Sequence, residues 1–275
     1  MTGTRSIEFL NCRFDSCTED EAFEQCVRWS RGPRESHLLL TVNVSILMML
    51  RTDTDLKTAC DAGELVVADG MPVVWGTKLL GTPLAGRVSG CDLMERILAD
   101  GADQELRVFF LGATEDVVST LVEKVRRDYP DLEIAGYRNG YFSEADYPEV
   151  LRQIRESRAD VLFVGMPTPF KEVWCHRFRE ELCTPAVVPV GGSFDVLAGF
   201  VTRAPRWMQR VGMEWFWRLA MEPRRMWKRY LVTNTKFLVL FAGAFAKTWF
   251  RRMRPRHHPE KLSARLLDHN PQKPI

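Results

Sequence analysis

Six apolar runs, separated by segments with helical spacing, constrain the fold of this 275-residue chain more than any other feature. The runs are rich in β-branched residues and do not alternate with polar ones, which is typical of strands buried on both faces of a sheet. Helices between successive strands indicate crossover connections, so the chain is predicted to be an α/β protein with a mostly parallel sheet and flanking helices. The runs end at Asn43, Asp69, Gly112, near Gly136, at Gly165 and at Gly192.

Polar and glycine residues gather where these runs end. In open parallel sheets, ligands bind at the carboxyl ends of the strands. We therefore expect the residues at the run ends to be neighbours in space although they are distant in sequence. They are Asn43, Asp69, Gly112, Gly165, Gly191 and Gly192.

The composition changes near Gly199, where Arg, Trp and Pro replace the strand pattern. Residues 200–256 contain 14 Lys and Arg against two acidic residues, so this segment carries +12 and the rest of the chain −10. Such a basic segment attracts anions such as lipid headgroups, nucleic acid or a phosphorylated substrate. We expect a catalytic domain over residues 1–199, a basic, Trp-rich helical appendage over 200–256 and a disordered tail over 257–275.

Several features bear on the location of the protein. The first residues lack an apolar core, so no signal peptide is expected. The apolar run Phe237–Ala246 is too short to span a bilayer, which needs about 20 residues. The seven cysteines form no C-x-x-C pair, which fits a reducing compartment and disfavours disulfides and zinc. We expect a cytoplasmic protein, peripheral on the inner face of the cell membrane.

Two run ends present candidate catalytic groups. Asp69 follows a buried strand, and the turn after it is enforced by Gly70 and Pro72. A carboxylate there can accept a proton from an attacking sugar hydroxyl. By spacing alone, capping of the helix that begins near Met71 is the more common role of such a residue. Capping does not exclude catalysis.

The segment from Val164 to Trp174 predicts a helix capped by Thr168 with Pro169 at its first position. Lys171 and Glu172 would then face outward near the strand ends. An ordinary helix start with solvated charges explains these residues equally well.

Glycines after the strands could let backbone approach a ligand. Gly191 and Gly192 precede a helix whose free N–H groups could face a phosphate, with Phe194 and Asp195 in its first turn. The signals at Gly112 and Gly140 are weaker. None of these segments is a G-x-G-x-x-G fingerprint, which disfavours a dinucleotide fold of the dehydrogenase kind.

A row of cations lies on a predicted helix of the appendage, which Pro223 breaks or restarts. Spacings of seven and three put Arg218, Arg225 and Lys228 on one face, with Arg229 adjacent. Such a row could neutralise a diphosphate or lie on anionic lipid. The carboxylates of Asp53 and Asp55 are interpreted as capping and solvated charge, and no metal site or cofactor is expected.

Together these segments resemble the WecG/TagA/CpsF family, glycosyltransferase family 26. The resemblance runs in order from about Ile7 to Tyr230. It rests on T-V-N at Thr41, A-D-G-M-P at Ala68, R-V-S-G-C-D at Arg87, F-L-G at Phe110, G-Y at Gly140, G-M-P-T-P-F-K-E-V-W at Gly165, G-G-S-F-D-V-L-A-G at Gly191, and R-A-P-R-W-M-Q-R-V-G-M-E-W-F-W-R-L-A-M-E-P-R-R at Arg203.

The resemblance implies a Rossmann-like domain with a membrane-associating appendage that completes the site. It implies an inverting, metal-independent transfer of a hexose from a UDP-sugar to a polyprenyl-diphosphate-linked sugar, in bacterial polysaccharide biosynthesis. The sugar would be N-acetylmannosamine, its uronic acid or a glucose-type hexose, and the enzyme could be a homo-oligomer.

The resemblance also implies residue roles. Asp69 would be the base beside Thr41 and Asn43, with Arg87 as a site arginine. Arg218 and Arg225 would contact the diphosphate. Two positions depart from the family pattern: Lys171 stands where many members have glutamine, and Lys228 where they have a third arginine. Lysine cannot fork onto a phosphate as arginine does, so substrate identity stays open.

Two other functions would also fit parts of the sequence. A non-catalytic nucleotide-sugar-binding scaffold of a membrane polysaccharide assembly complex would bind donor without releasing UDP. A nucleic-acid binder would explain the basic segment, but no recognition motif accompanies it. We expect a UDP-sugar, a lipid-linked acceptor and an anionic membrane surface as partners, and no nucleic acid.

Overall fold

The computed structural model of the chain describes residues 5–221 and 223–253, and its main feature is a six-stranded parallel sheet. The strand order is β4-β3-β8-β7-β5-β6. All six apolar runs form its strands, so the predicted α/β fold class is confirmed. The strands are β3 (His37–Val42), β4 (Leu65–Ala68), β5 (Arg107–Gly112), β6 (Glu133–Arg138), β7 (Val161–Gly165) and β8 (Ala186–Pro189).

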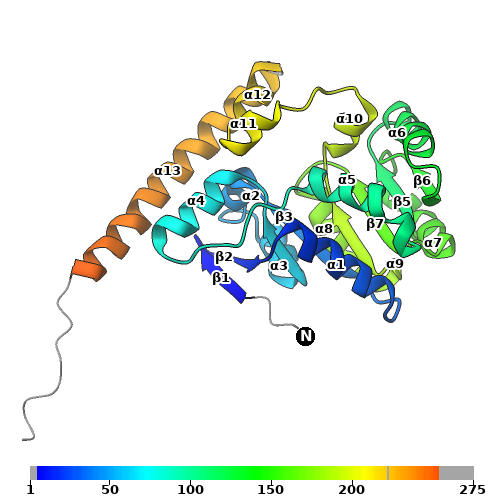
Figure 1. Cartoon of the computed structure of the whole chain (residues 1–275), viewed down its shortest axis with the longest axis horizontal. Helices are drawn as coiled ribbons and strands as arrows, with labels where there is room; N and C mark the ends of the chain where they lie inside the picture. The colour runs from blue at the N-terminus through cyan, green and yellow to red at the C-terminus, as the bar shows by residue number, and fades with distance from the viewer. Residues whose placement is uncertain (1–4, 222, 254–275) are drawn as a thin grey trace, which may run out of the picture.

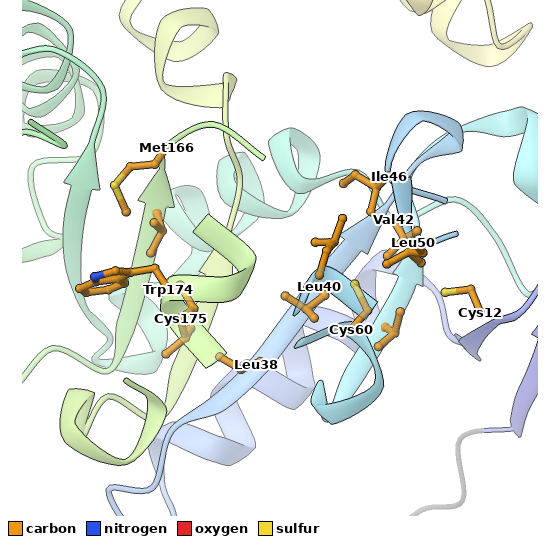
Figure 2. Close-up of a cluster of buried hydrophobic side chains, with 14 of the residues drawn as sticks. Cys12, Leu38, Leu40, Val42, Ile46, Leu50, Cys60, Met166, Trp174 and Cys175 are labelled. Atoms are coloured by element: carbon orange, nitrogen blue, oxygen red, sulfur yellow. The ribbon is translucent and has the colours of Figure 1, made fainter. Parts of the chain in front are cut away.

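Alternate residues of each central strand enter two separate hydrophobic cores. On β3, Leu38, Leu40 and Val42 face one core and Leu39 faces the other, as the two-residue period of a strand requires. Figure 2 shows residues of the first core, which include Leu38, Leu40 and Val42 of β3 as well as Trp174 and Cys175. A sheet covered on both faces in this way is the arrangement of Rossmann-like folds.

Helices cover both faces of the sheet (Figure 1). The core that contains Leu40 is closed by α2 (Val44–Met49), α3 (Thr54–Ala62), α7 (Tyr147–Ser157), α8 (Phe170–Arg177) and α9 (Arg179–Leu182). The other core is closed by α1 (Glu19–Ser30), α5 (Gly90–Asp100), α6 (Glu115–Asp128) and α10 (Ser193–Ala198). Two short 3₁₀ helices are η1 (Ala102–Gln104) and η2 (Glu144–Asp146).

Local signals set several helix starts. Thr18 and Glu21 form a capping box that begins α1. Asp53 caps α3 by accepting a hydrogen bond from the Leu56 N–H at 2.9 Å, as predicted for this carboxylate. All seven cysteines are free; six are buried and Cys183 is half-buried.

An N-terminal hairpin, which the sequence analysis missed, covers the β4 edge of the sheet. Strands β1 (Arg5–Phe9) and β2 (Cys12–Ser16) are joined by Leu10 and Asn11, both with positive φ. Asp15 accepts a hydrogen bond from the Val66 N–H at 2.8 Å, which satisfies an edge donor of β4. The sequence signal for this hairpin is the alternation of apolar and polar residues on both sides of the two-residue turn.

The C-terminal part folds as α11 (Arg206–Arg210), α12 (Glu214–Met221) and α13 (Pro223–Met253), beside α4 (Met71–Leu80) and α2 (Figure 1). Residue 222, between α12 and α13, lies outside the described residues, so the prediction that Pro223 breaks or restarts the helix stays a prediction. Arg218 lies on α12, and Arg225 and Lys228 lie on α13, so the predicted single cationic face stays a prediction. The predicted tail, 257–275, lies outside the described residues.

An aromatic contact attaches α13 to the body. Phe237 is buried, and its ring lies 6.4 Å from Phe9 of the hairpin and 5.9 Å from Phe241. Within the helical part that the structure describes, no segment is long and apolar enough to cross a membrane. Because the rings of Phe237 and Phe241 pack against Phe9, one side of the run Phe237–Ala246 faces the protein.

This attachment predicts a difference between two neighbouring residues of α13. Phe237→Ala should lower the free energy of unfolding by about 3–5 kcal/mol, because a buried ring is lost. Leu238→Ala, at a position 62% exposed, should change it by only about 0.5 kcal/mol. Urea denaturation measures both; equal losses would show that α13 is not held by this contact.

Candidate active site

Backbone hydrogen bonds draw the ends of β3 and β4 together with the segment that precedes α5. The Asp69 N–H donates to the Val42 carbonyl at 3.1 Å, and the Val88 N–H donates to the Ala68 carbonyl at 2.9 Å. A Cβ added to Gly90 would lie 3.3 Å from the Thr41 hydroxyl oxygen. The structure therefore brings Thr41, Asp69 and the segment after Arg87 to one edge, as predicted.

Asp69 is half-buried and lies one residue beyond β4. Gly70, with φ +133°, holds the N-cap position of α4, and Pro72 follows in the first turn. Gly70, not Asp69, is therefore the N-cap residue of this helix. Its carboxylate remains a candidate for chemistry at the strand edge.

Asn43 combines its position at the edge with a structural task. Its side-chain oxygen accepts a hydrogen bond from the Ile46 N–H at 3.1 Å and so caps α2. This bond fixes the first turn of α2 directly after β3. Any catalytic part played by Asn43 would rest on its remaining hydrogen-bonding capacity.

Three of the predicted donor-binding glycines allow very close backbone packing. A Cβ on Gly112 would lie 2.6 Å from the carbonyl carbon of Gly165, and one on Gly140 would lie 2.9 Å from Gly112. The Ala113 N–H donates to the Gly165 carbonyl at 2.9 Å. β5 and β7 are neighbours in the sheet. The chain continues from β5 to β6 on one side of this pair and from β7 to β8 on the other side, so the direction of strand addition reverses between them. A crevice at such a switch point is the usual ligand site of open α/β sheets.

Phe194 packs against the end of β7. It is fully buried, its ring lies 5.9 Å from that of Phe110, and a Cβ on Gly165 would lie 2.5 Å from it. It therefore packs in the core and does not line the molecular surface. Asp195 in the same helix is half-buried.

The environment of Lys171 and Glu172 differs from the predicted one. Both are buried, with 5% and 3% exposure, so the prediction that they face outward is wrong. The Lys171 ammonium donates to Glu172 Oε1 and to the Thr168 hydroxyl, and that hydroxyl donates to Glu172 Oε1 at 2.9 Å. Pro169, not Thr168, is the N-cap residue of α8. Residues adjacent on a helix do not normally face each other, so their spacing gave no sign of this pair.

The buried pair lies under the glycine loop that follows β8. Gly191 has φ +58°, and a Cβ there would lie 3.4 Å from Lys171 Cε. The exposed Gly192 follows as the N-cap of α10. Because Glu172 compensates the charge of Lys171, the lysine adds no net positive charge to the strand edge. The nearby Cys175 thiol has a raised pKa, caused first by burial and then by the Glu172 carboxylate.

Arg87 takes part in an ion-pair network that the sequence analysis missed. It pairs with Asp92 of α5 and with Glu214 at the start of α12, the latter at 3.5 Å. Asp92 also pairs with Arg203. Glu19 faces this network; burial raises its pKa, and the Asp92 carboxylate raises it further. Glu214 stands 127 residues after Arg87, so no local pattern links them.

The backbones of four predicted site cations lie in the C-terminal helices α12 and α13. Their side chains lie outside the described part of the structure. Their predicted contacts therefore remain predictions. These residues are Arg218, Arg225, Lys228 and Arg229.

Residues 7–254 match the model of the glycosyl transferase WecG/TagA/CpsF family. The chain belongs to this family. It is accordingly a glycosyltransferase, and the resemblance seen in the motifs is confirmed over nearly the whole chain.

Curated members of the WecG/TagA/CpsF family include three similar proteins with the same name, N-acetylglucosaminyldiphosphoundecaprenol N-acetyl-beta-D-mannosaminyltransferase. The proteins from Bacillus spizizenii and Bacillus subtilis are 36% and 35% identical over 70% of this chain, and cover 74% and 75% of their own length. The Staphylococcus aureus protein is 29% identical over 90% of this chain and 94% of its own.

The buried pair of α8 gives a stability prediction. Lys171→Met should destabilise the protein by about 3–5 kcal/mol, because Glu172 would be left buried without a counter-charge. The double variant Lys171→Met/Glu172→Leu should recover most of this loss. Urea denaturation of both variants measures the difference; a double variant no more stable than Lys171→Met would contradict the pairing.

Proposed function

We propose that the protein is an inverting, metal-independent glycosyltransferase that moves a hexose from a UDP-sugar to a polyprenyl-diphosphate-linked sugar. The names of its relatives support an N-acetylmannosamine-type donor sugar and an N-acetylglucosaminyl-diphospho-undecaprenol acceptor. A uronic acid or a glucose-type hexose is the alternative donor sugar. Bacterial polysaccharide biosynthesis is the process that uses such a product.

The observation that carries the proposal is the position of Asp69. Its half-buried carboxyl group follows β4 at an edge that also presents Thr41 and the segment after Arg87. In the proposed reaction Asp69 takes the proton from the acceptor hydroxyl. That oxygen attacks the anomeric carbon from the face opposite the diphosphate, the bond from this carbon to the UDP oxygen breaks, and UDP leaves.

The leaving diphosphate gains negative charge, which the C-terminal helices would neutralise. Arg218 on α12 and Arg225 on α13 are proposed for this role, with Lys228 and Arg229 nearby in sequence. The glycines at the ends of β5, β7 and β8 are proposed to line the donor site. The division into a catalytic domain over 1–199 and an appendage over 200–256 follows from this assignment.

Substitution of the proposed base tests the reaction directly. Asp69→Asn should slow UDP release by about 10²–10⁴-fold, because a positioned base is lost. Binding of the UDP-sugar should persist. The matched control is Asp53→Asn, since Asn also caps a helix and Asp53 caps α3. An Asp69→Asn enzyme with near-full turnover would rule out the assignment.

We propose further that α13 associates with an anionic membrane surface on the cytoplasmic side. Its outer side carries large exposed apolar residues among basic ones, a combination suited to lipid headgroups. These residues are Trp227, Leu231, Val232, Leu238, Val239 and Trp249.

Vesicle sedimentation tests this surface. Leu238→Asp/Val239→Asp should weaken binding to vesicles that contain anionic lipid, because two apolar contacts are replaced by charges that the surface repels. Tyr137→Asp, at an exposed aromatic residue of β6, serves as the control and should bind normally. Unchanged binding of the α13 variant would contradict the proposal.

A further inference from the structure

Five charged side chains meet where the C-terminal helices join the body. Asp92 of α5 uses its two oxygens separately: Oδ2 accepts from Arg87 and Oδ1 accepts from Arg203. The other amino group of Arg87 lies 3.5 Å from Glu214 Oε2, and Arg203 lies 3.5 Å from Glu95. This charge cluster therefore links α5 to the connection before α11 and to the first residue of α12.

The cluster is partly shielded from water. The side chains of Arg87 and Arg203 are each 17% exposed, that of Asp92 is 19% exposed and that of Glu214 is 24% exposed. Ion pairs at such positions are screened less than pairs on the open surface, where each contributes little. A bridging carboxylate that holds two arginines also fixes the direction of both guanidinium groups.

Uncharged contacts at the same joint place α12 beside the candidate base. A Cβ on Gly212 would lie 2.9 Å from Met71 Cβ and 3.1 Å from the Trp75 ring, so the turn before α12 rests on the first turns of α4. That helix begins directly after Asp69 and Gly70. The Trp217 ring N–H donates to the Thr202 carbonyl at 3.0 Å, which ties α12 to the preceding connection.

We propose that Arg87 is a positioning residue that acts through Glu214. Its guanidinium, oriented by Asp92, holds the first turn of α12 against the strand edge and so sets the place of the helix that carries Arg218. Arg87 does not itself contact the donor or the acceptor. This inference rests on the proposed function, and it assigns to Arg87 a different task from that of a substrate-binding arginine.

A double-mutant cycle separates the two roles. Arg87→Gln and Glu214→Gln break the same contact, so each should lower kcat for UDP release by on the order of ten-fold or more. The double variant should then be no slower than Arg87→Gln alone. A Glu214→Gln enzyme with wild-type kcat, or losses that multiply in the double variant, would show that Arg87 acts on the substrate instead.

Hydrogen exchange gives a readout that does not depend on turnover. Both single variants and the double variant should exchange faster in α11 and α12, while β7 in the core stays protected and shows that the body is folded. If wild-type enzyme released no UDP from any donor, the proposed function would fail, yet exchange would still test the joint. Unchanged exchange in α12 of Glu214→Gln would overturn the positioning role.

The matched control is an exposed ion pair on α7. Arg152 and Glu149 lie 2.8 Å apart with about half of each side chain exposed. Arg152→Gln and Glu149→Gln make the same changes in charge as the test variants. Both should leave kcat and the exchange of α12 unchanged; an equal effect from this pair would mean that the loss reflects net charge alone.

Discussion

The parallel direction of all six strands is the constraint on which the rest of the structure depends. Because every strand runs the same way, the loops after β3, β4, β5, β7 and β8 emerge at one edge, while two cores occupy the faces. Groups as distant in sequence as Asp69 and Gly191 are placed at that edge by backbone pairing alone. Chemistry that needs one base and a close backbone approach to a diphosphate can therefore be built there.

At the carboxyl ends of the strands, the residues that the structure describes supply little net positive charge. Lys171 is neutralised by Glu172, and Arg87 is paired with Asp92 and Glu214. The cations assigned to the leaving diphosphate belong to α12 and α13. How these helices are attached is consequently as important as where the base lies. Their attachments include the aromatic contact of Phe9 with Phe237, the packing of the turn at Gly212 on α4 and the charge cluster around Asp92.

Much of the fold could be predicted because its signals are local. The β-branched runs became strands, and the Thr18 capping box begins α1 as its spacing indicates. The site was predicted only in outline. The ion pair of Lys171 with Glu172 joins neighbours that helical spacing keeps apart, and that of Arg87 with Glu214 spans 127 residues. Such contacts arise from tertiary packing, so neither period nor propensity reveals them.

A crystal structure with bound UDP would test the central claim most directly, namely that the strand edge and the C-terminal helices form one site. The account predicts the diphosphate at the carboxyl ends of β5, β7 and β8, in contact with Arg218 or Arg225, with its terminal phosphate toward Asp69. UDP bound elsewhere on the body, or at this edge with both arginines turned away from it, would contradict the account.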